Sequence, residues 1–230
     1  MTPAQSVHHT VRIWDLPTRL FHWALFVCVV GLIITGNVGN EWMAWHFRLG
    51  YCVMTLLLFR IVWGLIGGRW SRFASFIFAP STVMAYLKGR GKPEHSAGHN
   101  PLGAGSVFAL LGFLMLQVGT GLISDDEIMN QGPLARFVSG ARVSLATWWH
   151  KDVGKWAIAA LIVLHIAAIL FYVYKKKENL IKPMLHGDKE LTAPVQPSLD
   201  DGRSRVIALV VLAVCAGFVY WVQSLKAVGF

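Results

Sequence analysis

Apolar side chains occupy long stretches of this chain, and polar residues gather between them. Five stretches are each near the roughly 20 residues that a bilayer core requires; they are residues 20–36, 42–67, 102–123, 147–177 and 206–222. The second stretch is not a plain lipid-facing helix, because it contains Arg48 and Arg60. The pattern predicts an all-α integral membrane protein, with a four-helix transmembrane bundle and a fifth, C-terminal transmembrane helix.

Composition supports this class. The chain has 230 residues, of which 55% are hydrophobic and only 14% charged, and its mean hydropathy is +0.51. Soluble domains carry about 25% charged residues. Ten tryptophans are many for this length, and several of them, such as Trp42 and Trp148, stand at ends of the apolar stretches. Membrane proteins place aromatic belts at that level.

The formal net charge is +9, and the Lys and Arg residues are distributed unequally between alternate loops. Fourteen Lys and Arg residues fall in the N-terminal segment and alternate loops, against three in the remaining loops and the C-terminal tail. The positive-inside rule therefore predicts a cytoplasmic N-terminus and an external C-terminus. Since the charges lie between apolar stretches, we attribute them to orientation and contact with anionic lipid, not to nucleic-acid binding.

The polar segment 178–205 interrupts the pattern of spans. It contains Pro183, Pro194 and Pro197 and is predicted to be a cytoplasmic linker. The expected domains are therefore a four-helix domain over 1–177, the linker over 178–205, and the fifth helix with an external tail over 206–230. We expect the fifth helix to dock a partner or a second copy of the chain.

Four of the nine histidines lie in or at the predicted spans, namely His22, His46, His150 and His165. The predicted topology puts His46 and His150 near the outer side, and His22 and His165 toward the cytoplasm. His150 and His165 share one span; fifteen helical residues rise about 22 Å and bring both to roughly one face. Each histidine alone could be an interhelical hydrogen-bond partner.

Two histidine pairs at two depths fit the axial ligands of two stacked haems in a helical bundle. Bis-histidine ligation fills both axial positions, which favours electron transfer over oxygen binding. Zinc is a rival, but it prefers four ligands at one depth. A histidine proton relay is another rival, and it more often includes a membrane carboxylate. The three cysteines form no C-x-x-C-H motif, so the haems are expected to be non-covalent.

Four motifs carry a family resemblance: VRIWDLPTRLFHW (11–23), WHFRLGYCVMTLLLFRIVWGLIGGRWSRF (45–73), GHNPLGA (98–104) and WWHKDVGKW…LHI (148–166). Over about residues 10–177 the chain resembles the prokaryotic di-haem cytochrome b family, which includes cytochrome b subunits of nickel–iron hydrogenases and related quinone-linked b-type cytochromes. The resemblance implies a multi-pass protein of the bacterial inner membrane with a periplasmic C-terminus. It also implies two b haems, with His22 and His165 on the inner haem and His46 and His150 on the outer.

Haem propionates need cationic partners. Arg60 and Arg19 are candidates at the inner haem, and Arg48 and Lys151 at the outer, since arginine binds carboxylates in a bidentate manner. The alternative for these residues is anchoring by the positive-inside rule. His99 and Asn100 are candidates for a quinone site at the cytoplasmic side. The alternative for Asn100 is a helix start, with Pro101 at the first helical position.

The predicted function is transmembrane electron transfer between the quinone pool and a periplasmic redox partner, such as a hydrogenase, a c-type cytochrome or another oxidoreductase. One alternative is a membrane cytochrome b that oxidises superoxide and reduces ubiquinone. A second is a haem-bearing membrane anchor of a complex. Whether the chain is itself an enzyme stays open. The expected partners are membrane lipid, quinone and the redox protein, with a homo-oligomer as a further possibility.

Overall fold

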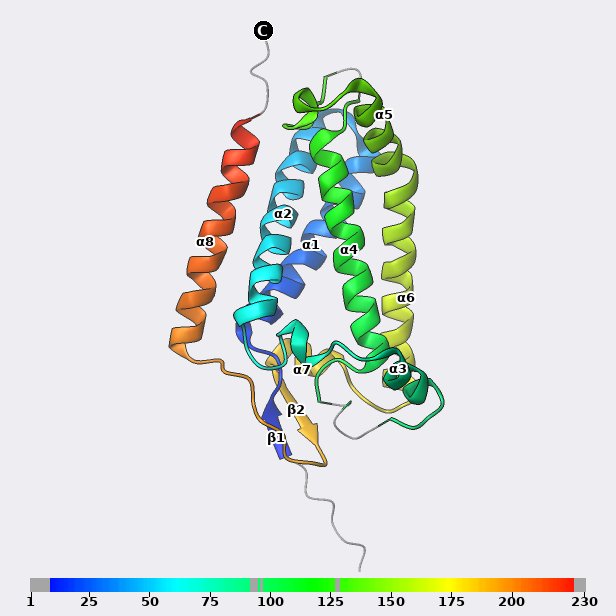
Figure 1. The fold of residues 1–230 in the computed structure, drawn as a ribbon, viewed down its shortest axis with the longest axis vertical. Coiled ribbons are helices and arrows are strands. Elements are labelled where there is room, and N and C mark those ends of the chain that lie inside the picture. The colour runs from blue at the N-terminus through cyan, green and yellow to red at the C-terminus, as the bar shows by residue number, and fades with distance from the viewer. Residues whose placement is uncertain (1–8, 92–94, 96, 127–128, 226–230) are drawn as a thin grey trace, which may run out of the picture. The chain divides into compact units, whose positions relative to one another are not determined.

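A computed structural model describes residues 9–91, 95, 97–126 and 129–225, and these are mainly helical. The predicted fold class, an all-α integral membrane protein with five spans, is confirmed. The ends of the two outer predicted domains, residues 1–8 and 226–230, lie outside the described residues. The spans are α1 (Leu16–Val38), α2 (Met43–Ile66, preceded by the 3₁₀ turn η1, Asn40–Trp42), α4 (Pro101–Ile123), Gly140–Tyr174 and α8 (Gly202–Ser224) (Figure 1).

The fourth span is composite. It consists of α5 (Gly140–Trp148), the π-helix η5 (Trp149–Gly154) and α6 (Lys155–Tyr174). The sequence pattern predicts a regular helix here and does not signal the π-helical turn. The remaining elements are short: α3 (Pro80–Leu87), α7 (Ile181–His186), η2 (Phe73–Ser75), η4 (Ala135–Phe137), β1 (His9–Arg12) and β2 (Asp188–Leu191).

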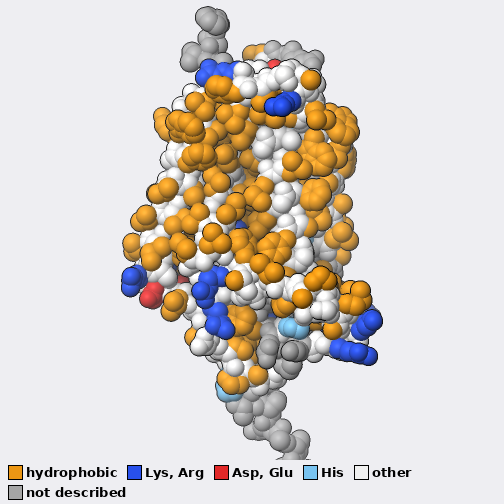
Figure 2. Space-filling view, in the orientation of Figure 1, with side chains coloured by type: hydrophobic (Ala, Val, Ile, Leu, Met, Phe, Trp, Pro, Cys, Tyr) orange, Lys and Arg blue, Asp and Glu red, His pale blue; other side chains and the backbone are white. Residues whose placement is uncertain are grey.

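Large apolar side chains on the spans are exposed, which suits a hydrocarbon solvent. Leu65 and Val163 are 67% and 65% exposed. Figure 2 shows apolar side chains covering the helices, with Lys and Arg near the helix ends. Hydrocarbon offers the backbone no hydrogen bonds, so a spanning segment must satisfy its own N–H and C=O groups as a helix.

The chain divides into two compact units, and each is described by itself. The first comprises Met1–Leu20, Ile61–Phe108 and His165–Ala208; the second comprises Phe21–Arg60, Ala109–Leu164 and Leu209–Phe230. The second unit has a four-helix core, to which α1, α2, α4 and α6 all contribute. Its buried residues are Val29, Val53, Leu57, Leu114 and Ile158.

The fifth helix also buries one side. Within the second unit, Cys215, Val219 and Val222 of α8 are at most 8% exposed. Their spacing of four and three residues places them on one face of a helix. A stripe of this kind indicates packing against protein, while Leu209 and Tyr220 remain exposed. In its second-unit part, α8 is therefore packed along one face and open along another.

The polar segment 178–205 is structured, and it is part of the first unit. It contains α7 and β2, and β2 pairs antiparallel with β1, so that His9 faces Leu191 and Arg12 faces Asp188 (Figure 1). Ile13, Trp14 and Leu191 share a buried cluster with Ala97. The segment is thus more ordered than the plain linker that its composition suggests, because it completes a small sheet and an apolar core.

Asp200 ties the start of α8 to the N-terminal segment. Its Oδ2 accepts a hydrogen bond from Arg12 (2.7 Å), and its Oδ1 accepts from the Leu16 amide (3.2 Å) and from Arg205 Nε (3.1 Å). Burial alone would raise the pKa of Asp200, but the hydrogen bonds from Arg205, Leu16 and Arg12 outweigh it and lower that pKa below its usual value. The carboxylate is therefore charged at neutral pH and attaches the start of α8 to the N-terminal segment, while Asp201 caps the helix by accepting from the Ser204 amide at 2.8 Å.

Asp15 joins the start of α1 to the end of α2. The carboxyl group is fully buried. Its Oδ1 accepts hydrogen bonds from the Thr18 amide (2.8 Å) and Trp63 Nε1 (3.1 Å). Its Oδ2 accepts from the Gly68 amide (3.2 Å) and Ser71 Oγ (2.5 Å). The first contact caps α1 in the usual manner, and the other three attach that cap to the segment 63–71.

We expect Asp15→Asn to lower the free energy of unfolding by roughly 2 kcal/mol, because the amide puts donors where the carboxylate accepts from N–H and O–H groups. Thermal and chemical unfolding of the detergent-solubilised protein measure the loss. Glu190→Gln is the matched control, since Glu190 is exposed in the same unit. Equal stability of the two variants would contradict the role given to Asp15.

Candidate functional site

The second unit brings two of the predicted ligands together. His46 lies in the first turn of α2, and His150 lies in η5. Their ring centres are 6.1 Å apart and the ring planes are nearly perpendicular, at 87°. Both side chains are half-buried. A metal ion about 2 Å from one nitrogen of each of two imidazoles separates the ring centres by about 6 Å, so this spacing suits one metal between the rings.

His46 is held by a short segment of α1, which we call the α1 cradle (Leu32, Thr35 and Gly36). Thr35 Oγ1 lies 3.3 Å from His46 Nδ1, and the backbone of Leu32 lies beside the same ring. Thr35 donates its own hydroxyl hydrogen to Gly31 O at 2.7 Å. Its oxygen is therefore left to accept from the imidazole.

His150 is held in the same way by α4, through the α4 cradle (Gln117, Thr120 and Gly121). His150 Nδ1 lies 2.9 Å from Gln117 O and 3.5 Å from Thr120 Oγ1. Thr120 likewise donates to a carbonyl of its own helix, Leu116 O, at 2.9 Å. In both cradles the threonine follows the carbonyl residue by three positions, and a glycine comes next.

These contacts fix the tautomer of both rings. A backbone carbonyl can only accept, so Nδ1 of His150 must carry the hydrogen. For His46, Thr35 Oγ1 can accept from Nδ1, because the Thr35 hydroxyl hydrogen is directed to Gly31 O. A neutral imidazole protonated at Nδ1 keeps its lone pair on Nε2. Metal-ligating histidines usually donate their other N–H to a carbonyl in this way. Each ring is thus prepared to bind metal through Nε2.

The glycine of each cradle makes room for a ring. A Cβ placed on Gly36 would lie 3.0 Å from His46 Cε1, and one placed on Gly121 would lie 2.8 Å from His150 Cε1. Either distance is closer than carbon atoms normally approach. Larger residues would push the imidazoles away from the helices that hold them.

The π-helical turn η5 and the side chain of Gln117 also help to hold His150 in place. In a π-helix the hydrogen-bond register changes, and such turns are frequent at functional sites. Gln117 Nε2 donates to His150 O at 2.9 Å, so Gln117 and His150 bind one another twice. Gly154 allows the Gln117 side chain to approach, because a Cβ there would overlap Gln117 Oε1.

The other predicted ligands, His22 and His165, lie in different units, and each is described alone. His22 is half-buried in α1, with its ring 5.2 Å from that of Trp23 and perpendicular to it. His165 is half-buried in α6. Their assignment to one haem stays a prediction.

The candidate cations differ in their surroundings. Arg60 is buried, at 3% exposure, in the last two turns of α2. Arg19 is half-buried and donates to Leu185 O at 2.6 Å. Arg48 and Lys151 are exposed, and the Arg48 guanidinium lies 4.8 Å from the centre of the Trp45 ring. Arg60 is therefore the most deeply buried of these four candidates.

The predicted quinone residues lie at the start of α4. Asn100 Oδ1 accepts from the Gly103 amide at 2.8 Å, which is a helix cap with Pro101 in the first turn. The His99 ring lies between those of Trp14 and Phe76, at 4.7 and 4.4 Å. The helix-start interpretation thus accounts for the Asn100 side-chain oxygen, and a quinone role for His99 and Asn100 stays a prediction.

The sequence analysis did not identify the cradles. Neither Thr35–Gly36 nor Thr120–Gly121 was a candidate, and Gln117 and Gly154 were also missed. A signal exists: the pair Thr-Gly occurs near the C-terminal end of both the first and the third span. Within the described residues, no group of three or more His, Cys, Asp or Glu side chains could hold a metal ion. The histidines of this site form a pair.

An all-α membrane protein that presents paired imidazoles between its helices has the architecture of a membrane b-type cytochrome. Comparison agrees: the sequence model of the prokaryotic cytochrome b561 family matches residues 13–187, and the chain belongs to that family. The expected cytochrome b resemblance is thereby confirmed. The chain is a multi-pass membrane protein that uses haem b for electron transfer.

Curated relatives are similar over most of their length. A "Probable Ni/Fe-hydrogenase 1 B-type cytochrome subunit" of Escherichia coli K12 is 25% identical over 209 residues, which cover 76% of this chain and 88% of the relative. A "Probable Ni/Fe-hydrogenase B-type cytochrome subunit" of Bradyrhizobium diazoefficiens is 23% identical over 219 residues, covering 79% and 86%. Its counterpart in Cupriavidus necator is 25% identical over 211 residues, covering 76% and 85%. No solved structure matches the chain.

We expect Gly121→Ala to lower haem affinity, because the added Cβ displaces the His150 ring from the α4 cradle. Changes next to a metal ligand typically reduce affinity about 10- to 100-fold. Haem content and the reduced absorption spectrum, measured during titration with a competing apo-protein, give the loss. Gly119→Ala is the matched control on the same helix, since a Cβ at Gly119 meets nothing within 4 Å. If both variants kept the wild-type affinity, the cradle would have no role in ligand placement.

Proposed function

We propose that this protein moves electrons across the membrane through two non-covalent b haems, each ligated by two histidines. The outer haem is bound by His46 and His150, and the inner by His22 and His165. The observation that carries the proposal is the pair of perpendicular imidazoles 6.1 Å apart, each held at Nδ1 by a neighbouring helix. The bound haem supplies the redox chemistry, and the chain sets its position and surroundings.

The residues at the outer site suit such a haem. A neutral imidazole that donates through Nδ1 to its cradle keeps the lone pair on Nε2, and neutral imidazole is a haem ligand. Two protein ligands leave no axial position for oxygen, which favours electron transfer. The cradles also fix the ring orientation before the haem binds, and a fixed ligand set lowers the reorganisation that accompanies electron transfer. Arg48 and Lys151 would contact the outer propionates.

The inner site is supported by the elements that carry its residues. His22 lies six residues after the start of α1, and His165 lies nine residues before the end of α6. In the predicted topology the start of α1 and the end of α6 face the same side. Arg60, buried near the end of α2, would neutralise an inner propionate, and Arg19 is the second candidate.

The proposed path connects the quinone pool with a redox partner at the periplasmic face of the bacterial inner membrane. The N-terminus would be cytoplasmic and the C-terminus periplasmic, as the distribution of Lys and Arg favours. The relatives named as hydrogenase cytochrome subunits support a hydrogenase as the partner class. His99 and Asn100 mark the proposed quinone site, beside the inner haem.

The domain proposal follows from this path. The four-helix part over 1–177 would hold both haems, and the fifth helix in 206–230 would serve assembly. The segment 178–205 contributes β2 to the first unit, so we assign it to the cytoplasmic end of the haem-bearing part and not to a free connection.

Removal of single ligands tests the haem assignment. We expect two haems per wild-type chain in a pyridine haemochrome assay and one in His150→Ala or His165→Ala, with different haems lost in the two variants. His186→Ala, at an exposed position outside the spans, is the control and should retain both. Loss of both haems from either variant while the chain still inserts and folds would refute the two-level assignment.

Transfer across a bilayer tests the function. In liposomes with ferricyanide inside and impermeant dithionite outside, the wild-type protein should reduce the enclosed oxidant. His150→Ala and His165→Ala should fall to the rate of protein-free liposomes, because one haem cannot bridge the hydrocarbon core. Wild-type rates at that background would refute transmembrane conduction. Superoxide-driven quinone reduction by the purified protein alone would instead support the alternative of a self-contained enzyme.

A further inference from the structure

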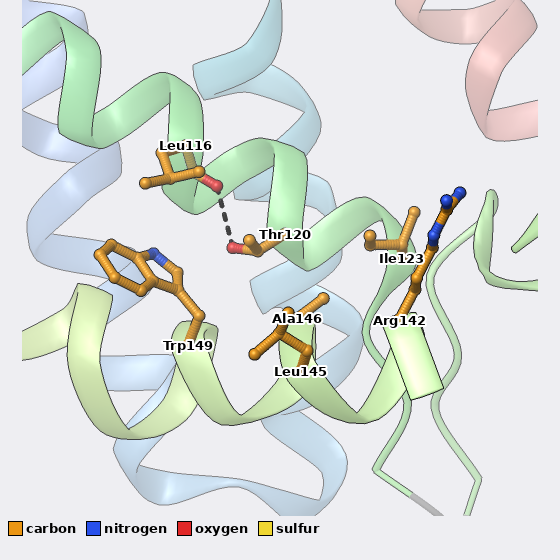
Figure 3. Close-up of a pocket in the computed structure, with 7 residues that line it drawn as sticks. All are labelled: Leu116, Thr120, Ile123, Arg142, Leu145, Ala146 and Trp149. Atoms are coloured by element: carbon orange, nitrogen blue, oxygen red, sulfur yellow. Dashed lines mark hydrogen bonds between the residues drawn. The ribbon is translucent and has the colours of Figure 1, made fainter. Parts of the chain in front are cut away.

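A pocket opens beside the α4 cradle, on the surface of the second unit. It lies between the C-terminal half of α4 and the start of the fourth span, and its volume is about 350 Å³. That volume is within the range of sites that hold one small molecule. The lining residues are Leu116, Thr120, Ile123, Arg142, Leu145, Ala146 and Trp149 (Figure 3).

The shape of the pocket comes from residue size. Ala146 is only 4% exposed and forms the floor, where its small side chain leaves the hollow. Leu116 and Leu145, 46% and 63% exposed, form walls on the two helices. Such a hollow between exposed apolar walls faces the hydrocarbon solvent of a membrane protein. Its interior suits an alkyl chain.

The pocket has a polar end and an apolar end. Arg142 is in the first turn of α5, opposite Ile123, the last residue of α4, and its guanidinium extends beyond Ile123 (Figure 3). Trp149 and Leu116 lie at the other end, seven residues along each helix, or about 10 Å deeper. A cation at the helix ends above an apolar hollow matches the polarity of a phospholipid with an anionic headgroup.

Arg142 is exposed at the rim of the pocket. Across the described parts of the chain, no acidic side chain forms an ion pair with Arg142, and no side-chain hydrogen bond engages its guanidinium. Arg136, in the same external segment, instead stacks on Phe137 at 4.6 Å. Arginine binds phosphate with two parallel hydrogen bonds. Phosphate is therefore the group that the rim of the pocket suits.

A quinone head fits the pocket less well than an alkyl chain. Quinone oxygens need hydrogen-bond donors, and the hydroxyl of Thr120 already donates to carbonyls of its own helix. The indole nitrogen of Trp149 lies on the side of Gly154, where a Cβ would be 2.8 Å away. Thr120 and Trp149 thus turn their polar groups away from the hollow, which presents carbon below the Arg142 guanidinium (Figure 3).

We propose that this pocket binds one anionic phospholipid, with an acyl chain over Ala146 between Leu116 and Leu145 and the phosphate paired with Arg142. The site is distinct from the quinone site proposed at the start of α4. It shares Thr120 with the α4 cradle, so the bound lipid covers the outer face of the segment that holds His150. This inference does not depend on the direction of electron flow or on a partner.

Lipid titration of the haem-loaded, full-length protein in dodecylmaltoside tests the site. Native mass spectrometry measures the affinity for dioleoyl-phosphatidylglycerol and for dioleoyl-phosphatidylcholine. The wild type should bind one phosphatidylglycerol about fivefold more tightly than phosphatidylcholine, the factor that one cation near anionic lipid contributes. Arg142→Gln should remove this preference. Arg136→Gln, the matched control, should keep it.

A second variant tests the hollow and not the charge. Ala146→Leu fills the floor and should weaken both lipids equally, while an unchanged haem spectrum shows that the fold persists. The proposal is wrong if Arg142→Gln and Arg136→Gln behave alike, or if the wild type does not distinguish the two lipids. It is also wrong if a soluble quinone displaces the bound molecule equally from wild type and Arg142→Gln, which would assign the pocket to quinone.

Discussion

An imidazole placed between membrane helices must have its N–H satisfied, and the site formed by His46 and His150 is organised by this requirement. Hydrocarbon offers no hydrogen bond, so Nδ1 of His46 and of His150 turns to carbonyl and hydroxyl oxygens of the adjacent helix. The same hydrogen bonds leave Nε2 with its lone pair and direct it away from that helix. One interaction therefore satisfies a polar group, selects the tautomer and aims the metal-binding nitrogen.

The two cradles hold their imidazoles with the same three kinds of residue in the same order. A carbonyl residue, a threonine three positions later and then a glycine occur as Leu32, Thr35 and Gly36 in α1, and again in α4. The threonine keeps its hydroxyl hydrogen on its own helix and so can accept. The glycine lets the ring lie against the backbone. The π-helical turn of η5 adds the reciprocal contact between Gln117 and His150, which only the α4 cradle has.

The first unit depends on buried carboxylates in place of imidazoles. Asp15 joins α1 to the segment 63–71, and Asp200 joins the N-terminal segment to the start of α8. Each accepts several hydrogen bonds, so the cost of burying its charge is offset. These contacts tie together residues more than 180 positions apart in the chain, such as Arg12 and Asp200. The contacts of Asp200 and the pairing of β1 with β2 hold the proline-containing segment 178–205 against the N-terminal segment.

The sequence by itself determined the membrane class, the five spans and the family, because hydrocarbon imposes span length. It also made four membrane histidines candidates as ligands, because a histidine in a membrane span is exceptional. It did not reveal the cradles, the π-helical turn or the roles of Asp15 and Asp200. Gly121, for example, has no functional side chain. Its role, leaving room for the His150 ring, becomes visible only when another helix brings that ring against it. In the sequence, Asp200 is likewise only one residue of the predicted linker. Its contacts with the N-terminal segment exist only in the folded structure, in which β1 and β2 pair. Tertiary structure decided these features, because hydrogen bonds and steric limits between distant segments exist only after the helices have packed.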